Sequence, residues 1–114
     1  MITCVLEYRI DRAREAEFEQ WCRMWLRLLP KFGAIHHGYF LPSEGRSDVA
    51  LGLFSFPSLG AYERYRCAAA VDVEVIAATR FRDGNAGVLS WNRTFFRPVL
   101  PADDCQRPPE PVDK

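Results

Sequence analysis

The sequence lacks the features that mark nucleic-acid-binding, membrane-spanning or secreted proteins. Fifteen basic and fifteen acidic residues balance to a net charge of zero, whereas binding to phosphate backbones needs a surplus of positive charge on one face. No apolar stretch approaches the roughly 18 residues that cross a bilayer, and the first residues, Met-Ile-Thr-Cys, carry no signal-peptide pattern. We therefore expect a cytoplasmic protein whose partners include neither nucleic acid nor membranes.

The sequence has no closely spaced cysteines and only two histidines. The four cysteines are scattered with no closely spaced pair, and 48% of the residues are apolar, which is enough for a core without disulfides. We expect reduced thiols, three of which act as small core hydrophobes. The two histidines, His36 and His37, are neighbours in an expected strand, so their side chains point to opposite faces and cannot bind one ion. Because a zinc site needs three or four converging ligands, we expect no tightly bound metal.

The apolar residues that are present follow the periods of strands and helices. In residues 2–10 every second side chain is apolar, which indicates a strand with one buried face. Asp11 can cap a helix whose apolar residues recur at spacings of three and four as far as about residue 32. The remaining expected elements are strands at 34–41, 48–56 and 86–97 and helices that begin after Ser58 and after Asp72.

The predicted order is β-α-β-β-α-β, with the second crossover divided into two helices. This is the ferredoxin-like arrangement of an α+β protein. The strand at 48–56 is apolar almost throughout, which suits a central strand covered on both faces. We assign residues 1–98 to one domain. Five of the eight prolines fall from Pro98 onward, so we expect residues 99–114 to form an extended or disordered tail.

Three stretches of the chain resemble the NIPSNAP family. They are HHGYFLPSEG at 36–45, FSFPSL at 54–59 followed by YERYR at 62–66, and FFRP at 95–98. The resemblance implies a dimeric α/β barrel, the fold of small monooxygenases, haem-degrading enzymes, chlorite-dismutase-like proteins and muconolactone-isomerase-like proteins. A fold with so many reactions does not supply a function by itself.

The resemblance and the aromatic content together suggest that the cavity of such a barrel holds a small molecule. By analogy with the fold relatives, we expect a cofactor-independent oxygenase or isomerase that acts on a small aromatic metabolite. The alternatives are a non-catalytic dimeric interaction domain and a module that holds a small molecule or haem. No glycine-rich phosphate loop or nucleophile elbow is present, so the residues themselves imply no cofactor.

Polar residues near the expected barrel cavity form a candidate site. Alternation places His37 and Tyr39 on one face of the second strand, and that face is expected to point inward because the other face carries a glycine suited to close packing. Glu7 lies on the less apolar face of the first strand. Arg93, on the last strand, could bind an anion through its fork of donors. We predict catalytic roles for His37 and for Glu44 at the mouth, and ligand binding by Glu7, Tyr39 and Arg93.

Each of these residues also has a structural interpretation. One histidine could face solvent, a turn glutamate is usually solvated, and Glu7 could form an ion pair with Arg93 or Arg9. A β-bulge would exchange the faces of the second strand. Trp21 and Trp25 fit the packing stripe of the first helix. Since the helices of such a fold cover only one face of the sheet, we expect the other face to be buried in a homodimer.

Overall fold

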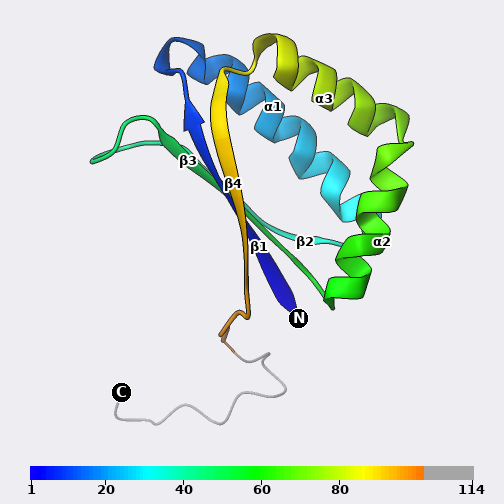
Figure 1. Cartoon of the computed structure of the whole chain (residues 1–114). Helices are drawn as coiled ribbons and strands as arrows, with labels where there is room; N and C mark the ends of the chain where they lie inside the picture. Colours follow the sequence, from blue (N-terminus) through cyan, green and yellow to red (C-terminus); the bar gives the residue numbers. More distant parts are fainter. Residues whose placement is uncertain (102–114) are drawn as a thin grey trace, which may run out of the picture.

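The computed structural model describes residues 1–101, in which four strands form one antiparallel sheet. The strands lie in the order β2-β3-β1-β4 (Figure 1). The chain order is the predicted β-α-β-β-α-β, with two α-helices in the second crossover. The strands are β1 (Ile2–Ile10), β2 (Ile35–Phe40), β3 (Val49–Phe56) and β4 (Val88–Phe96).

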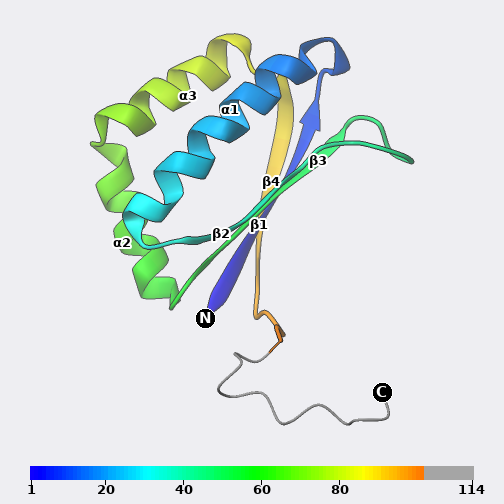
Figure 2. The ribbon, with the colours of Figure 1, turned by 180° about the vertical axis from the view of Figure 1, so that it is seen from behind.

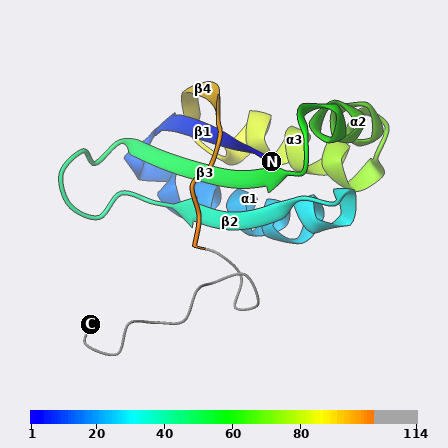
Figure 3. The same cartoon turned by 90° about the horizontal axis from the view of Figure 1, so that it is seen from below.

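The three α-helices cover the same face of the sheet (Figures 1 and 2). They are α1 (Glu15–Leu28), α2 (Leu59–Ala70) and α3 (Val73–Asn85). Figure 3 shows β2 and β3 in front with α1 behind them, and no helix of the described chain lies on the near side. The protein is therefore a ferredoxin-like α+β sandwich of one sheet and one helical layer. β3 is an inner strand, as predicted, but the described residues cover only one of its faces.

The core fills the space between the helices and the face of the sheet that they cover. Cys4, Tyr8 and Ile10, at alternate positions of β1, are 1–3% exposed, and Phe18 of α1 is fully buried. The Tyr8 ring meets the Phe18 ring edge-on with centroids 5.4 Å apart. Burying an aliphatic or aromatic side chain contributes about 1.5–3 kcal/mol, so these contacts hold α1 on the sheet.

The helix ends follow the capping residues of the sequence, with one difference at the start of α1. Ser58 caps α2 and Asp72 caps α3 through side-chain oxygens that accept backbone N–H groups at 2.9–3.1 Å. Asp11, in contrast, caps a single 3-10 turn at Arg12–Arg14, and the α-helix begins only at Glu15. The first predicted helix is therefore a 14-residue α-helix between two 3-10 turns.

Strand β2 contains a bulge that changes which side chains share a face. Its pairing with β3 shifts between His36 and Gly38, so that His37 is an extra residue. As a result His36 and Tyr39 lie together on the helix-covered face, with ring centroids 4.9 Å apart. The prediction that His37 and Tyr39 share a face is therefore wrong, because a shift of one residue exchanges the two faces.

The cysteines and the C-terminal segment agree in part with the predictions. Cys4 and Cys22 are buried free thiols, whereas Cys67 is exposed on α2, whose buried residues Tyr62 and Tyr65 face the sheet instead. Residues 97–101 have no regular structure, and Cys105 with the rest of the predicted tail lies outside the described residues. Within the described chain, no helix has the length and apolar character required to cross a bilayer.

Candidate functional site

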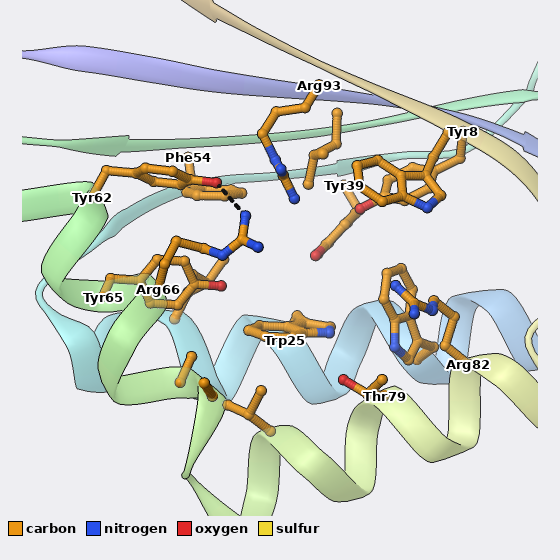
Figure 4. A pocket seen from close by; sticks show the side chains of 17 residues that line it. Tyr8, Trp25, Tyr39, Phe54, Tyr62, Tyr65, Arg66, Thr79, Arg82 and Arg93 are labelled. Atoms are coloured by element: carbon orange, nitrogen blue, oxygen red, sulfur yellow. Dashed lines mark hydrogen bonds between the residues drawn. The ribbon is translucent and has the colours of Figure 1, made fainter. Parts of the chain in front are cut away.

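A cavity of about 260 Å³ lies between the helix-covered face of the sheet and the three α-helices. Figure 4 shows side chains from the strands on one side and from the helices on the other pointing into this space. Most of the lining is aromatic or aliphatic, and three arginines interrupt it. The lining residues are Leu6, Tyr8, Trp21, Trp25, Leu29, Tyr39, Phe54, Tyr62, Tyr65, Arg66, Ala69, Ala70, Val75, Thr79, Arg82, Trp91 and Arg93.

The aromatic walls of the cavity are fixed by ring-to-ring packing. Trp21 contacts Tyr8 edge-on at 5.6 Å between centroids and lies 6.3 Å from the ring of Tyr39. The Tyr39 ring lies directly over Gly52 of β3: a Cβ atom at that glycine would be only 2.6 Å from the ring. The absence of a side chain at Gly52 is therefore what lets Tyr39 reach its place in the wall.

Two arginines bring positive charge into the cavity from opposite layers of the fold. Arg66 comes from α2 and donates from Nη1 to the Tyr62 hydroxyl at 3.0 Å. Arg93 comes from β4, with its guanidinium carbon 4.9 Å from the centre of the Trp91 ring. Within residues 1–101 neither guanidinium has an ion-pair partner, and the described lining contains no Asp or Glu. The Nε of Arg93 is buried without a hydrogen-bond partner.

The third arginine of the lining, Arg82, is already partnered. Its Nη2 lies 3.1 Å from the Asp83 carboxylate, so part of its charge is neutralised at the cavity rim. The excess positive charge of the cavity therefore belongs to Arg66 and Arg93.

Three tyrosines of the lining stay neutral at physiological pH because they are buried. Burial raises the pKa of Tyr8 and of Tyr39 above the usual range, and it raises the pKa of Tyr65 to about 12 even though Arg66 and Arg93 lie near enough to lower it. A protonated hydroxyl can donate a hydrogen bond, and those of Tyr8 and Tyr39 also interact with each other.

The thiol of Cys4, close to Arg93, is also protonated. Burial raises its pKa to about 11 despite the neighbouring guanidinium. A nucleophilic cysteine needs a lowered pKa, so the surroundings of Cys4 do not favour that role.

The structure brings together two of the five residues predicted for the site. Tyr39 and Arg93 both line the cavity. Glu7 does not: it pairs across the sheet with Asn92, while Arg93 pairs with Leu6, so Glu7 and Arg93 point to opposite faces. Glu44 is exposed in the loop between β2 and β3. The Glu7–Arg93 ion pair proposed as a structural alternative is therefore wrong.

His37 lies on the uncovered face of the sheet, in a row of hydrogen-bonded side chains. Its Nε2 is 2.7 Å from the Ser55 hydroxyl, which is itself 2.7 Å from the Thr3 hydroxyl. The other structural alternative, a Glu7–Arg9 pair, is also not formed, because Arg9 binds Asp48 at 2.9 Å.

His36 packs behind the cavity wall rather than in it. Its Nδ1 accepts the backbone N–H of Gly38 at 2.9 Å, and its ring lies 6.0 Å from that of Phe54. Burial lowers its pKa to about 4, so the ring is neutral at physiological pH and supports Tyr39 as a packing residue. No group of three or more His, Cys, Asp or Glu within the described residues is arranged to hold a metal ion.

Three residues that build the site were not predicted from the sequence: Arg66, Trp25 and Gly52. Trp25 was interpreted as part of the packing stripe of α1, and Arg66 was given no role. One sequence signal was available for Gly52, because a glycine inside an otherwise apolar strand marks a close approach by another group. Which group approaches depends on the pairing of β2, and that pairing contains the bulge.

Comparison with known proteins shows that other proteins share this fold. A NIPSNAP domain of Burkholderia xenovorans has a TM-score of 0.74 and 18% identity over 91% of this chain and 100% of its own. A NIPSNAP family protein of Agrobacterium tumefaciens has a TM-score of 0.71 and 20% identity, with 90% and 94% covered. A Caulobacter crescentus protein provisionally classed as an antibiotic biosynthesis monooxygenase reaches 0.61 at 18% identity, with 87% and 90% covered.

These solved structures establish the fold alone, because all of them are less than 25% identical to this chain. No curated protein matches the sequence. The family model named NIPSNAP, however, matches residues 5–101, which include all of the sheet except the first three residues of β1, and every residue that lines the cavity. The chain therefore belongs to the NIPSNAP family.

Proposed function

We propose that the cavity binds a small planar aromatic molecule that carries an anionic oxygen. The observation that supports this proposal is the pair of guanidinium groups, Arg66 and Arg93, that share an aromatic cavity without a carboxylate among the described lining residues. Two like charges near each other in a partly apolar site are unfavourable unless an anion joins them. Arginine also presents donors whose geometry matches a carboxylate.

The shape and lining of the cavity support a planar ligand of modest size. Its volume of about 260 Å³ lies just below the usual range for sites that bind drug-sized molecules. The rings of Trp25 and Tyr39 offer flat apolar surfaces around that space (Figure 4), and Trp21 also lines it. An aromatic ring fits such surfaces through offset or edge-on contacts, and its acidic group would meet the two arginines.

An enzymatic reaction in this cavity would use the same donors. The neutral Tyr39 hydroxyl and the guanidinium groups would stabilise negative charge that develops on a substrate oxygen. Such charge forms in cofactor-independent oxygenation and in isomerisation by proton transfer, the two reaction classes expected from the sequence. The catalytic roles predicted for His37 and Glu44 do not enter the proposal, because neither residue lines the cavity.

The haem-binding alternative has less support from the geometry. An axial imidazole would have to face the cavity, and neither His36 nor His37 is among the described residues that line it. Burial raises the pKa of Tyr8 and of Tyr39, so both stay protonated, which disfavours them as axial ligands.

The proposal predicts that charge on the ligand decides whether it binds. We expect benzoate to bind measurably at pH 7 and benzamide, which has the same ring without the charge, to bind at least about tenfold more weakly, because hydrogen bonds to charged groups are the stronger ones. Isothermal titration calorimetry with both compounds checks this. Raising the ionic strength should weaken only benzoate binding. Equal affinities for the two compounds, or no binding of either, would contradict the proposal.

We propose further that the uncovered face of the sheet pairs with the same face of a second copy. Cross-strand register places Ile35, Phe40 and Phe96 on this face, and each is 52–53% exposed. Leu51 and Leu53, in the middle of the same face, are half-buried within a single chain. Apolar side chains gathered on one face of a sheet mark an interaction surface. The sheet of a second copy would cover the exposed apolar side chains of this face.

The pairing predicts a dimer that one charge on the sheet face disrupts. Light scattering at micromolar concentration should give twice the chain mass of 13.1 kDa, and Leu53→Asp should give the single-chain mass, because a buried unpaired carboxylate is costly at an apolar interface. Val73→Asp is the matched control: Val73 is 80% exposed at the start of α3, so this variant should stay dimeric. A wild-type monomer at that concentration would rule out the sheet-to-sheet dimer.

A further inference from the structure

The cavity contains a second polar feature at some distance in the sequence from its two arginines. The indole N–H of Trp25 is buried and has no hydrogen-bond partner in the described structure. A buried donor left without an acceptor is costly, and few native groups remain in that state without a reason. The Trp25 ring lines the cavity from the helix side, across from the Tyr39 hydroxyl and the guanidinium groups (Figure 4).

Trp21, one turn earlier on α1, shows what an ordinary structural tryptophan does here. Its N–H donates to the Ala78 carbonyl of α3 at 3.1 Å, and its side chain is 4% exposed. The two indoles meet edge-on with centroids 6.5 Å apart. The same residue type on the same helix face is therefore satisfied at position 21 and unsatisfied at position 25.

We propose that Trp25 determines specificity by donating its N–H to an oxygen substituent on the ring of the bound aromatic anion. This inference rests on the proposed function and narrows the ligand class to hydroxy- or oxo-substituted aromatic acids. The acid group meets Arg66 and Arg93, and the second oxygen meets Trp25. A site with a buried donor discriminates against the analogue that lacks the matching acceptor, because that analogue leaves the donor unpaired.

The test compares benzoate with 2-, 3- and 4-hydroxybenzoate by calorimetry on wild-type protein and on Trp25→Phe. We expect at least one hydroxy isomer to bind the wild type about three- to tenfold more tightly than benzoate, the range of one neutral hydrogen bond. Trp25→Phe keeps an aromatic wall but has no N–H, so it should bind benzoate and lose the preference for the hydroxy isomer.

Trp21→Phe serves as the matched variant. It removes the hydrogen bond from the indole N–H to the Ala78 carbonyl and part of a buried ring, so it should lower the melting temperature and weaken both ligands while keeping their affinity ratio. Loss of the ratio in Trp25→Phe alone supports the assignment. A wild type without any preference, or a preference that survives in Trp25→Phe, overturns it. If only the role of Trp25 is wrong, the wild type would still bind benzoate in preference to benzamide. If the proposed function itself is wrong, the wild type would not bind benzoate.

Discussion

Arg93→Met is expected to weaken benzoate binding by about 10- to 100-fold, the range of a hydrogen bond to a charged group. Methionine keeps most of the length and apolar surface of the side chain, so the change removes mainly the guanidinium. Arg66 remains in the cavity, where its Nη1 is engaged with the Tyr62 hydroxyl. The proposed ligand would therefore lose the donor group that has no other hydrogen-bond partner at Nε.

The same substitution is expected to leave the melting temperature unchanged or slightly higher. The Arg93 guanidinium has no ion-pair partner among residues 1–101 and shares the cavity with the like charge of Arg66. Arg80→Met provides the control, because Arg80 is exposed on α3 and does not line the cavity. Calorimetry and thermal unfolding of both variants separate binding from stability. Wild-type affinity for benzoate in Arg93→Met would contradict the proposed role of Arg93.

Gly52→Ala is expected to lower the free energy of unfolding by about 1–3 kcal/mol, the usual cost of overpacking a core. The added Cβ would lie 2.6 Å from Cε1 and 2.9 Å from Cδ1 of Tyr39. The tyrosine ring cannot move away freely, because Tyr8, Trp21 and His36 pack around it. In a strand, alanine is otherwise favoured over glycine by roughly 0.5–1 kcal/mol, so the overlap outweighs the gain in backbone entropy.

Displacement of Tyr39 should also reduce benzoate binding, since the ring forms part of the cavity wall. Gly84→Ala is the opposite case: a Cβ there meets nothing within 4 Å, and α3 should gain a few tenths of a kcal/mol from the better helix former. Urea unfolding of the two alanine variants measures both effects. A Gly52→Ala variant as stable as the wild type would contradict the close approach of Tyr39 to β3.

Local patterns along the chain were enough to predict the fold. Alternation defined β1, spacings of three and four defined α1, and the caps Ser58 and Asp72 marked the two helices of the second crossover. Each of these patterns spans only a few residues. They predict the elements correctly because the apolar face of each element is the face that is buried in the folded protein. The start of α1 was less well predicted, since Asp11 is equally suited to cap a 3-10 turn or an α-helix.

Predicting the candidate site required the pairing between strands, which the sequence of a single strand does not show. Alternation along β4 correctly placed Arg93 beside Trp91, and both line the cavity. In β2, alternation wrongly put His37 and Tyr39 on the same face, because the extra residue is visible only in the pairing with β3. Arg66 reaches the cavity from a helix 27 positions earlier in the chain than Arg93, and their convergence is a product of the tertiary fold.

Because of the bulge, β2 could lose one residue without a change in which side chains point to which face of the sheet. His37 has no counterpart on β3, so His36 and Gly38 would still meet Phe54 and Leu53 if the extra residue were deleted. Every other side chain would keep its face and its neighbours. Relatives one residue shorter at this point can therefore share the whole cavity wall. An alignment that puts the gap elsewhere in the strand would match the wrong residues to Tyr39.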